Sequence, residues 1–575
     1  MGSGQRQVVL ASMVFAIIAW IVAPWFGTPR QNPDISQEPL LFDGGRALAA
    51  TREFVTRYPR RPLGSLEARQ STAFFRQRLQ PMGFEVSYGH FEATVESRTQ
   101  VGRNVLALKR GPSPEILAVL AHYDTADTTV QGAMDNGSGI GALIELGRVL
   151  TDSPLRHTLL LVATDGKEWG MLGASDLASS YEARRRIMAA LSLDYAAAGD
   201  LANLQLAATG RMRGFSPGWL RDLCRAAAAA EGLPVLEPHG FMEHAERAIL
   251  LSWTDQGPLL AHDLPAINLG SGSADPVLEH RIYHSSGDRV ETLKAKSLEQ
   301  FGRTAERILR SLDERPPGAK ETAAPFLITR ETYLSEAVVA ALHILTFRPL
   351  LAAAAFSLAS AQPRLHLGET LRELLAFIGT LLPLIAAYYA IILLTNVGRI
   401  PAFTLYPPGP KQPLLENPDA GTLFGLAVVA VISAVASFLG VRFAAHRLPP
   451  VEFGVARAVN LILLAVVSVA ALWYNSFWAA TFLLLPAWCW AVVGRARGAA
   501  SRALNILLIV GAGLPWAMVT VYESSLLGIG WNMVWYAVLA LSTGMFRPYA
   551  FLLSAAAVAL GTRLLALQFL PSGHE

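Results

Sequence analysis

Hydrophobic and polar positions follow different patterns in the two halves of the chain. Between residues 43 and 312, short β-branched apolar runs alternate with longer segments of helical periodicity. The predicted strands are 104–109, 115–121, 158–164, 189–194 and 264–269, and the predicted helices include 65–82, 137–151, 217–231 and 292–312. Such alternation is typical of an α/β fold. We therefore expect a three-layer sandwich with a mostly parallel central sheet.

Long apolar segments replace this alternation in the second half, where charged residues are rare. They predict an all-α polytopic membrane domain of about eight helices over residues 335–570. The expected spans are 335–361, 373–396, 421–441, 458–474, 476–494, 503–522, 527–545 and 549–569. The first contains Arg348 followed by Pro349, which predicts a kinked helix or a re-entrant pair.

A further apolar stretch opens the chain. Val8 to Phe26 carries no charge and is just long enough to cross a bilayer core. A cleaved signal peptide is the competing interpretation, but the stretch ends in Trp25 and Phe26 without a small-x-small cleavage site. We therefore expect a signal anchor over 1–27, a linker over 28–42, the α/β domain over 43–315 and a second linker over 316–334.

Arginine positions predict the orientation in the membrane. Nine alternating spans place these basic residues on one side: Arg6, Arg364, Arg372, Arg442, Arg447, Arg457, Arg495, Arg497, Arg502 and Arg547. The loops on the other side hold only Arg399 and Lys411 as basic residues, offset by acidic ones. By the positive-inside rule, the N-terminus is cytoplasmic, while domain 43–315 and the C-terminus are extracytoplasmic. The abundant Ala and Arg favour a bacterial inner membrane.

Composition agrees with a membrane protein of more than one domain. The chain has 575 residues, of which 52% are hydrophobic, and a mean hydropathy of +0.34. A net charge of +3 without a basic run excludes nucleic acid as an expected partner. Cys224 and Cys489 are the two cysteines, so no disulfide framework is expected. The oligomeric state stays open.

Five side chains of metal-ligand type lie in distinctive contexts near predicted strand ends. They are His122 in A-H-Y-D-T, Asp135 in A-M-D-N-G-S-G, Glu168 in D-G-K-E-W-G, Asp194 in L-S-L-D-Y and His284 in Y-H-S-S-G-D. Each alone has an ordinary explanation; Asp135, for example, suits the cap of helix 137–151. Together, two imidazoles and three carboxylates suit two divalent metals bridged by one carboxylate, with Asp135 as the natural bridge.

These motifs resemble those of the di-zinc aminopeptidase family (metallopeptidase family 28), in particular its membrane-embedded branch, which includes the endoplasmic reticulum metallopeptidases. The resemblance covers roughly residues 43–312, whereas the second half agrees in layout only. It implies the five ligands above, two zinc ions, and Asp124 as the carboxylate that orients His122. It also implies a peptide substrate and a lipid bilayer as partners.

One position departs from the family pattern. The family has a Glu-Glu pair that supplies the general base and then a ligand, but this chain has Lys167 before Glu168. An ammonium cannot accept a proton, although repulsion by two metals lowers the pKa of a lysine and makes a neutral amine base conceivable. Asp165 is a second candidate for the base. Tyr283 is a candidate oxyanion donor or a packed aromatic, and Asp255 is expected to be structural.

We therefore expect a membrane-anchored zinc metallopeptidase, of the aminopeptidase type, that hydrolyses peptides outside the cytoplasm. The alternative is a catalytically impaired metal-binding protein that senses peptides or acts as a scaffold. A transporter is disfavoured, because the spans carry few ionisable residues, with Arg348 and Arg563 as exceptions that can snorkel. A single-metal cyclase with a related fold is disfavoured by the retention of both ligand sets.

Overall fold

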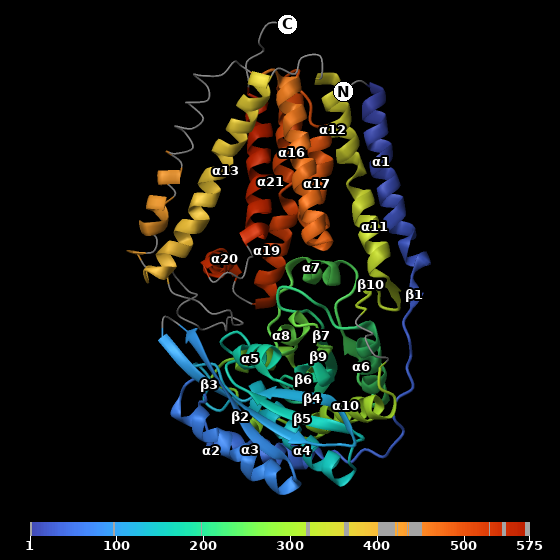
Figure 1. The fold of residues 1–575 in the computed structure, drawn as a ribbon, viewed down its shortest axis with the longest axis vertical. Coiled ribbons are helices and arrows are strands. Elements are labelled where there is room, and N and C mark those ends of the chain that lie inside the picture. Colours follow the sequence, from blue (N-terminus) through green and yellow to red (C-terminus); the bar gives the residue numbers. More distant parts are fainter. Residues whose placement is uncertain are drawn as a thin grey trace.

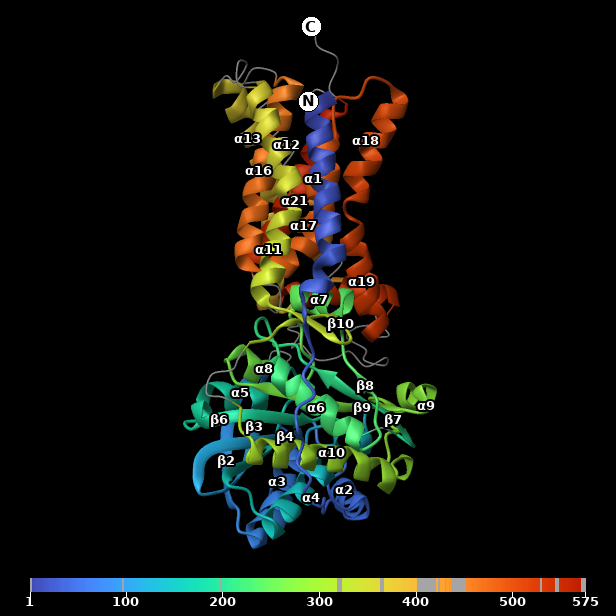
Figure 2. The same ribbon diagram turned by 90° about the vertical axis from the view of Figure 1, so that its right-hand side faces the viewer.

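The computed structural model describes residues 3–569 except 96–97, 197, 318–322, 362–366, 401–419, 422–423, 430, 434, 436–450, 528–529 and 543–547. A sheet domain and a bundle of long helices are stacked along the longest axis of the molecule (Figures 1 and 2). The N-terminal helix α1 (Ser3–Val22) lies in the bundle, and the chain then runs down to the sheet domain.

The two expected linkers meet at the junction of these parts. The strand β1 (Thr28–Pro29) pairs antiparallel with β11 (Thr332–Leu334), which pairs antiparallel with β10 (Phe326–Thr329). The chain therefore enters and leaves the sheet domain side by side through a small three-stranded sheet (Figure 1).

The sheet domain contains eight strands in the order β2-β3-β5-β4-β6-β9-β7-β8. The strands are β2 (Glu85–Val95), β3 (Arg98–Lys109), β4 (Ser113–His122), β5 (His157–Thr164), β6 (Ile187–Leu193), β7 (Leu201–Ala207), β8 (Val235–Leu236) and β9 (Ala266–Ser273). The central pairs β5–β4, β4–β6 and β6–β9 are parallel, and antiparallel pairs flank them. The expected α/β sandwich with a mostly parallel centre is confirmed.

Helices cover both faces of this sheet. They are α2 (Gly44–Arg57), α3 (Leu66–Leu79), α4 (Ser138–Asp152), α5 (Leu172–Ser180), α6 (Gly218–Ala230), α7 (Phe241–Ile249), α8 (Gln256–Ala261), α9 (Pro276–Ile282) and α10 (Ala295–Glu314). The larger core joins the sheet to α2, α3, α4, α6 and α10, and a smaller core joins the other face to α5 and α8. Burial of continuous apolar strands on both faces fixes the three layers.

The second half forms the bundle. Its helices are α11 (Glu336–Thr346), α12 (Arg348–Ala361), α13 (Leu367–Asn396), α16 (Phe453–Tyr474), α17 (Ser476–Val492), α18 (Ala499–Gly511), α19 (Leu514–Leu527), α20 (Met533–Ser542) and α21 (Pro548–Leu567). Six helical stretches of the described chain, including the N-terminal one, are long and apolar enough to span a membrane. The expected kink near Arg348 is present, because α11 and α12 are separate helices joined at Phe347. The expected span 421–441 lies mostly outside the described residues.

One expected crossing is wrong. The segment 527–545 was expected to span the membrane, but α20 is short and packs beside the sheet domain, where Tyr536 contacts Trp253. Consequently α21 starts near the sheet domain and ends at the far end of the bundle, where Gln568 accepts a hydrogen bond from Asn505. The end of α21 thus lies at the same end of the bundle as the start of α1 (Figure 1), not opposite it.

A buried ion pair inside the bundle was also missed from the sequence. Arg563 of α21 donates to Glu373 of α13 at 2.8 Å, and Asn460 of α16 donates to the same carboxylate at 2.6 Å. Arg563 was considered from the sequence as a residue that can snorkel, and the structure gives its guanidinium a buried carboxylate partner. Together with Asn460, this pair joins three helices.

Candidate metal centre

The ends of the central parallel strands bring the candidate ligands together. His122 is the last residue of β4 and is in register with Thr164, the last residue of β5. Asp194 directly follows β6, and Glu168 follows the turn after β5, in which Gly166 has the left-handed φ of +70°. Since parallel strands end at one edge of the sheet, residues distant in sequence meet there.

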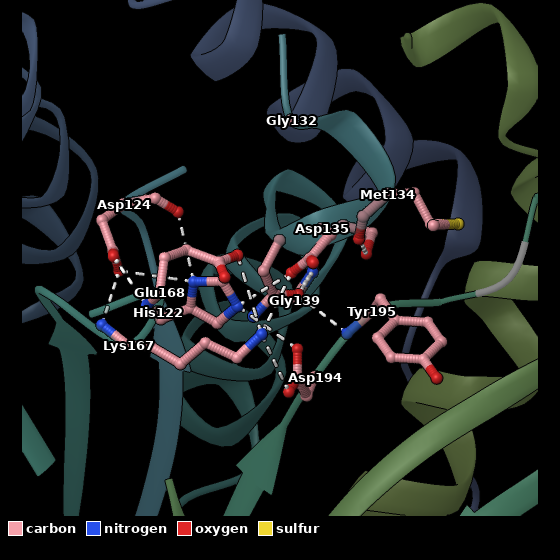
Figure 3. A network of polar contacts seen from close by, with 12 residues as sticks. His122, Asp124, Gly132, Met134, Asp135, Gly139, Lys167, Glu168, Asp194 and Tyr195 are labelled. Atoms are coloured by element: carbon pink, nitrogen blue, oxygen red, sulfur yellow. Dashed lines mark hydrogen bonds and ion pairs between the residues drawn. The ribbon is translucent and has the colours of Figure 1, made fainter. Parts of the chain in front are cut away.

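The other two candidates come from loops that approach this edge. Asp135 lies in the irregular turn Ala133–Gly137 that leads into α4, and His284 follows α9. All five predicted side chains are buried, with at most 2% of each residue exposed. Figure 3 shows His122, Asp135, Glu168 and Asp194 pointing toward one another.

The five side chains form two triads that share one carboxylate. The first contains His122, Asp135 and Asp194, and the second contains Asp135, Glu168 and His284, with the ligand atoms of each triad within 4.8 Å of one another. The Nε2 atom of His122 lies 3.0 Å from Asp135 Oδ1, and that of His284 lies 3.0 Å from Asp135 Oδ2. The two oxygens of Asp135 therefore face different triads, which is the arrangement a bridging carboxylate requires.

Asp124 braces the first triad, where the sequence placed it. Its Oδ1 lies 3.4 Å from Nδ1 of His122, on the opposite side of the ring from the other carboxylates. Its two oxygens also accept the backbone N–H groups of Lys167 at 3.1 Å and of Glu168 at 3.0 Å (Figure 3). One side chain thus orients the imidazole and holds the turn that carries Glu168.

Lys167 reaches into the centre of the cluster. Its Nζ lies 3.5 Å from Asp135 Oδ1, 3.5 Å from Asp194 Oδ2 and 3.7 Å from Glu168 Oε1. Burial lowers the pKa of Lys167, but these three carboxylates outweigh it and raise the pKa well above its ordinary value. These three carboxylates thus favour the ammonium form of Lys167.

The donor set fits zinc. Imidazole nitrogens and carboxylate oxygens are typical zinc ligands, and each triad supplies three of them. Both carboxylate oxygens of Glu168 are buried and accept no hydrogen bond from a described residue. Burial raises the pKa of Asp135 when taken alone, yet Lys167 and the two histidines hold it well below the usual range. The bridging residue is therefore ionised.

Two positioning residues were missed from the sequence. Asp288 accepts the backbone N–H of Met134 at 2.6 Å and that of Asp135 at 3.1 Å. Arg61 is fully buried and donates to four backbone carbonyls, including those of Tyr123 at 2.7 Å and Gly132 at 3.3 Å. Asp288 ends the motif Y-H-S-S-G-D and was available as a signal, whereas nothing in the local sequence distinguishes Arg61.

The remaining candidates have structural contacts. Asp165, considered as a substitute base, accepts the backbone N–H of Arg103 on β3 at 3.0 Å, so it turns away from the cluster, contrary to our expectation. Asp255 accepts from Thr164 Oγ1 at 2.5 Å, and burial raises its pKa to about 6. Tyr283 stacks on His284 with ring centroids 3.9 Å apart.

Sequence comparisons find relatives of the sheet domain. Residues 104–309 match the family model described as Peptidase family M28. The chain is 29% identical over 181 residues to the alkaline phosphatase isozyme conversion protein of Escherichia coli, which covers 27% of this chain and 52% of that protein. It is 34% identical over 90 residues to aminopeptidase YwaD of Bacillus subtilis, which covers 15% of this chain and 20% of that protein. A probable zinc metalloprotease of Leptosphaeria maculans is 31% identical over 181 residues, or 30% of this chain and 38% of that protein. The matches therefore span about half or less of these relatives' lengths.

Among solved structures, the glutaminyl cyclase of an Acidobacteriales bacterium has a TM-score of 0.41 at 22% identity and covers 50% of this chain and 99% of that one. A zinc aminopeptidase of Bacillus subtilis has a TM-score of 0.41 at 16% identity and covers 50% and 98% of the two chains. Residues 104–309 of this chain thus match Peptidase family M28, and the two triads lie within the matched residues.

Proposed function

We propose that this protein is a membrane-anchored, zinc-dependent aminopeptidase that binds two zinc ions. The observation that carries the proposal is the position of Asp135, whose two oxygens face separate triads of ligand atoms. His122 and Asp194 would complete one zinc site, and Glu168 and His284 would complete the other. Zinc bound there would act as a Lewis acid on a substrate carbonyl.

The protein's own residues then orient and tune this site. Asp124 fixes the ring of His122, and Asp288 holds the backbone of Asp135. Such outer partners typically change metal affinity or activity by about 10–100-fold when they are removed. These contacts hold the ligands in a defined geometry, as a metal site requires.

Lys167 occupies the position at which the family has a general base. As an ammonium, Lys167 cannot take a proton from an attacking water. Loss of a general base typically costs about 10²–10⁴-fold in rate, and the ligands remain in place. We therefore propose a slow peptidase rather than an inactive one.

A second candidate function is favoured by the same lysine. An ammonium within 3.7 Å of three carboxylates neutralises part of their charge. It thereby reduces their electrostatic attraction for a second metal ion. A catalytically silent domain that binds metal and captures peptides would show such a substitution.

We further propose that the sheet domain is extracytoplasmic and that a bacterial inner membrane surrounds the bundle. The support is the distribution of arginines. Arg457 and Arg502 lie at the bundle end away from the sheet domain, where Arg457 donates to the backbone of Val493 and Arg502 stacks on Phe569. Positive charge at the end remote from the sheet domain is what the positive-inside rule requires for this orientation.

A hydrolysis assay tests the proposal. The full-length protein in detergent, incubated with a panel of aminoacyl amides and short peptides, should release N-terminal residues slowly. Chelation should abolish this release and zinc should restore it. Release that persists after complete metal removal would contradict a zinc-dependent mechanism, and no release from any substrate would favour the silent binding domain.

A further inference from the structure

A cavity of about 250 Å³ lies beside the metal centre. Tyr195, the residue after the candidate ligand Asp194, forms part of its wall. Gly270 also lines it, and a Cβ atom at this glycine would lie 3.5 Å from the backbone oxygen of Asp194. We call this space the acidic cavity, for the reason given next.

Two glutamates from different parts of the molecule face this cavity. Glu246 comes from α7 of the sheet domain, and Glu523 comes from α19 of the bundle. Glu523 is buried and Glu246 is partly buried, and in the described part of the chain neither forms an ion pair with a basic side chain. Glu246 accepts one hydrogen bond, from Thr209 Oγ1 at 2.6 Å. Arg221 and Arg247 act on Glu246 electrostatically but pair with Glu243. Two carboxylates that lack a directly bonded cation form a site for positive charge.

A third hydrogen-bond acceptor, in the wall of the acidic cavity, also favours a positively charged ligand that donates hydrogen bonds. Asn268 is only 4% exposed, and its Oδ1 accepts no hydrogen bond from any described residue. A buried amide oxygen left without a donor is costly, so a ligand that donates there gains affinity. The neighbouring Gln256 cannot supply the missing donor to Asn268 Oδ1, because its Nε2 already donates to Thr209 O and Ser252 Oγ.

An apolar cavity adjoins the acidic cavity on the side of the bundle. Ile249, Leu251 and Glu523 line both spaces, so the two cavities share a wall. The second space, which we call the apolar cavity, has a volume of about 330 Å³. Aromatic side chains from α17, α19 and α20 dominate its lining: Trp478, Phe482, Trp516 and Tyr536.

We propose that these cavities together bind a peptide N-terminus, with its α-ammonium between Glu246 and Glu523 and a large apolar N-terminal side chain in the apolar cavity. An ammonium has three donors and no acceptor, which matches the two carboxylates and the amide oxygen of Asn268. Burial of the apolar group against aromatic walls adds affinity. As a statement about substrates, the inference rests on the proposed aminopeptidase function, but binding itself does not require catalysis.

The proposal makes the bundle part of the substrate site. Glu523 and most of the apolar lining belong to helices that follow the family-matched segment 104–309. Burial of a pocket by a second domain is a common way to exclude water and set specificity. The substrates would be peptides that begin with an aromatic or long aliphatic residue, rather than with a small or acidic one.

Alkylammonium ions test this binding without hydrolysis. Calorimetry on the full chain in nanodiscs, corrected with empty nanodiscs, should show hexylammonium binding at least about tenfold more tightly than hexanol. The measurement belongs above the pKa of Glu246, which burial raises to about 7. The substitutions Glu246→Gln and Glu523→Gln should each remove this preference, whereas Glu279→Gln, outside both cavities, should keep it. Equal binding of the two probes to the wild type would overturn the proposal.

A cavity-filling variant tests the apolar part. Ala537 of α20 lines the apolar cavity, and Ala537→Phe should weaken decylammonium more than methylammonium, with unchanged zinc content as the control for folding. Native mass spectrometry of the wild type and of Ala537→Phe should show the same bound phospholipids. A phospholipid that is bound to the wild type and lost from Ala537→Phe would assign the cavity to a lipid and overturn the proposal. If the protein binds the probes but hydrolyses no substrate, the proposed peptidase function is refuted and the proposed binding site is retained.

Discussion

The carboxylate of Asp288 holds the backbone of Asp135, whose N–H donates to Asp288 Oδ2 at 3.1 Å. The other oxygen of Asp288 accepts from the preceding N–H, that of Met134, at 2.6 Å. Both oxygens are therefore used to fix the segment that presents the shared carboxylate to two triads. The position of Asp135 depends on a residue that binds no metal.

Replacement of Asp288 by Asn should loosen the metal centre. An amide offers one acceptor oxygen, so one of the two N–H groups would meet a donor instead of an acceptor. We expect zinc affinity to fall by about 10–100-fold, as for other outer partners of metal ligands. Competition with a chromophoric chelator measures this change. Asp255→Asn, a buried carboxylate outside both triads, is the matched control and should leave affinity within a few-fold of the wild type.

Restoration of a carboxylate at position 167 should increase hydrolysis. Lys167→Glu supplies a group that accepts a proton, and we expect a gain of about 10²–10⁴-fold in rate without a change in zinc content. Lys167→Met separates this effect from simple removal of the positive charge, since it removes the ammonium but adds no base. An equal gain from both variants would show that the ammonium inhibits and that the missing base is not the cause.

Stability should decrease with rising pH because of Glu246. Burial raises the pKa of this residue from 4.5 to about 7, so the folded state holds a proton that the unfolded chain releases earlier. The sign follows directly: stability falls as pH rises between these two values and then levels off. Thermal unfolding in detergent measures the fall, and Glu246→Gln should flatten that part of the profile. An identical fall in the variant would assign the effect to other groups.

Accessibility labelling tests whether the segment 527–545 crosses the membrane, as hydropathy predicts, or stays beside the sheet domain, as in the structure. With Cys224 and Cys489 replaced, Asp200→Cys should react with an impermeant reagent in intact cells, and Arg497→Cys should be protected. Phe569→Cys at the end of α21 should be protected too, because α20 stays beside the sheet domain. The nine-crossing arrangement expected from hydropathy places position 569 on the opposite side, so its labelling in intact cells would restore that arrangement.

The sequence predicted the central strands because they are buried on both faces and therefore apolar throughout. β4 and β5 were found almost to the residue, whereas the edge strand β2, with polar residues such as Glu85 and His90, was missed. The candidate ligands were recognised because their types and contexts are unusual. Arg61 was not, since its role depends on backbone carbonyls that only the fold brings near it.

Contacts within the bundle could not be predicted from the sequence either, because only the fold brings the partners together. Glu373 and Arg563 are far apart in the chain, and each alone looks like a residue near a helix end. Likewise, α20 is as apolar as a spanning helix, and its contacts with sheet-domain residues such as Trp169 and Trp253 distinguish it as a helix that packs on that domain. Hydropathy measures whether a segment avoids water, not which apolar surroundings it enters.

The most direct test of the account is the zinc content of the full-length protein, measured by elemental analysis after purification without added chelator. We predict close to two equivalents per chain. Asp135→Ala should lose most of both, since one carboxylate serves both triads, and Asp255→Asn should retain them. No more than trace metal in the wild-type protein, or a full complement in Asp135→Ala, would contradict the two-zinc centre on which the proposed function rests.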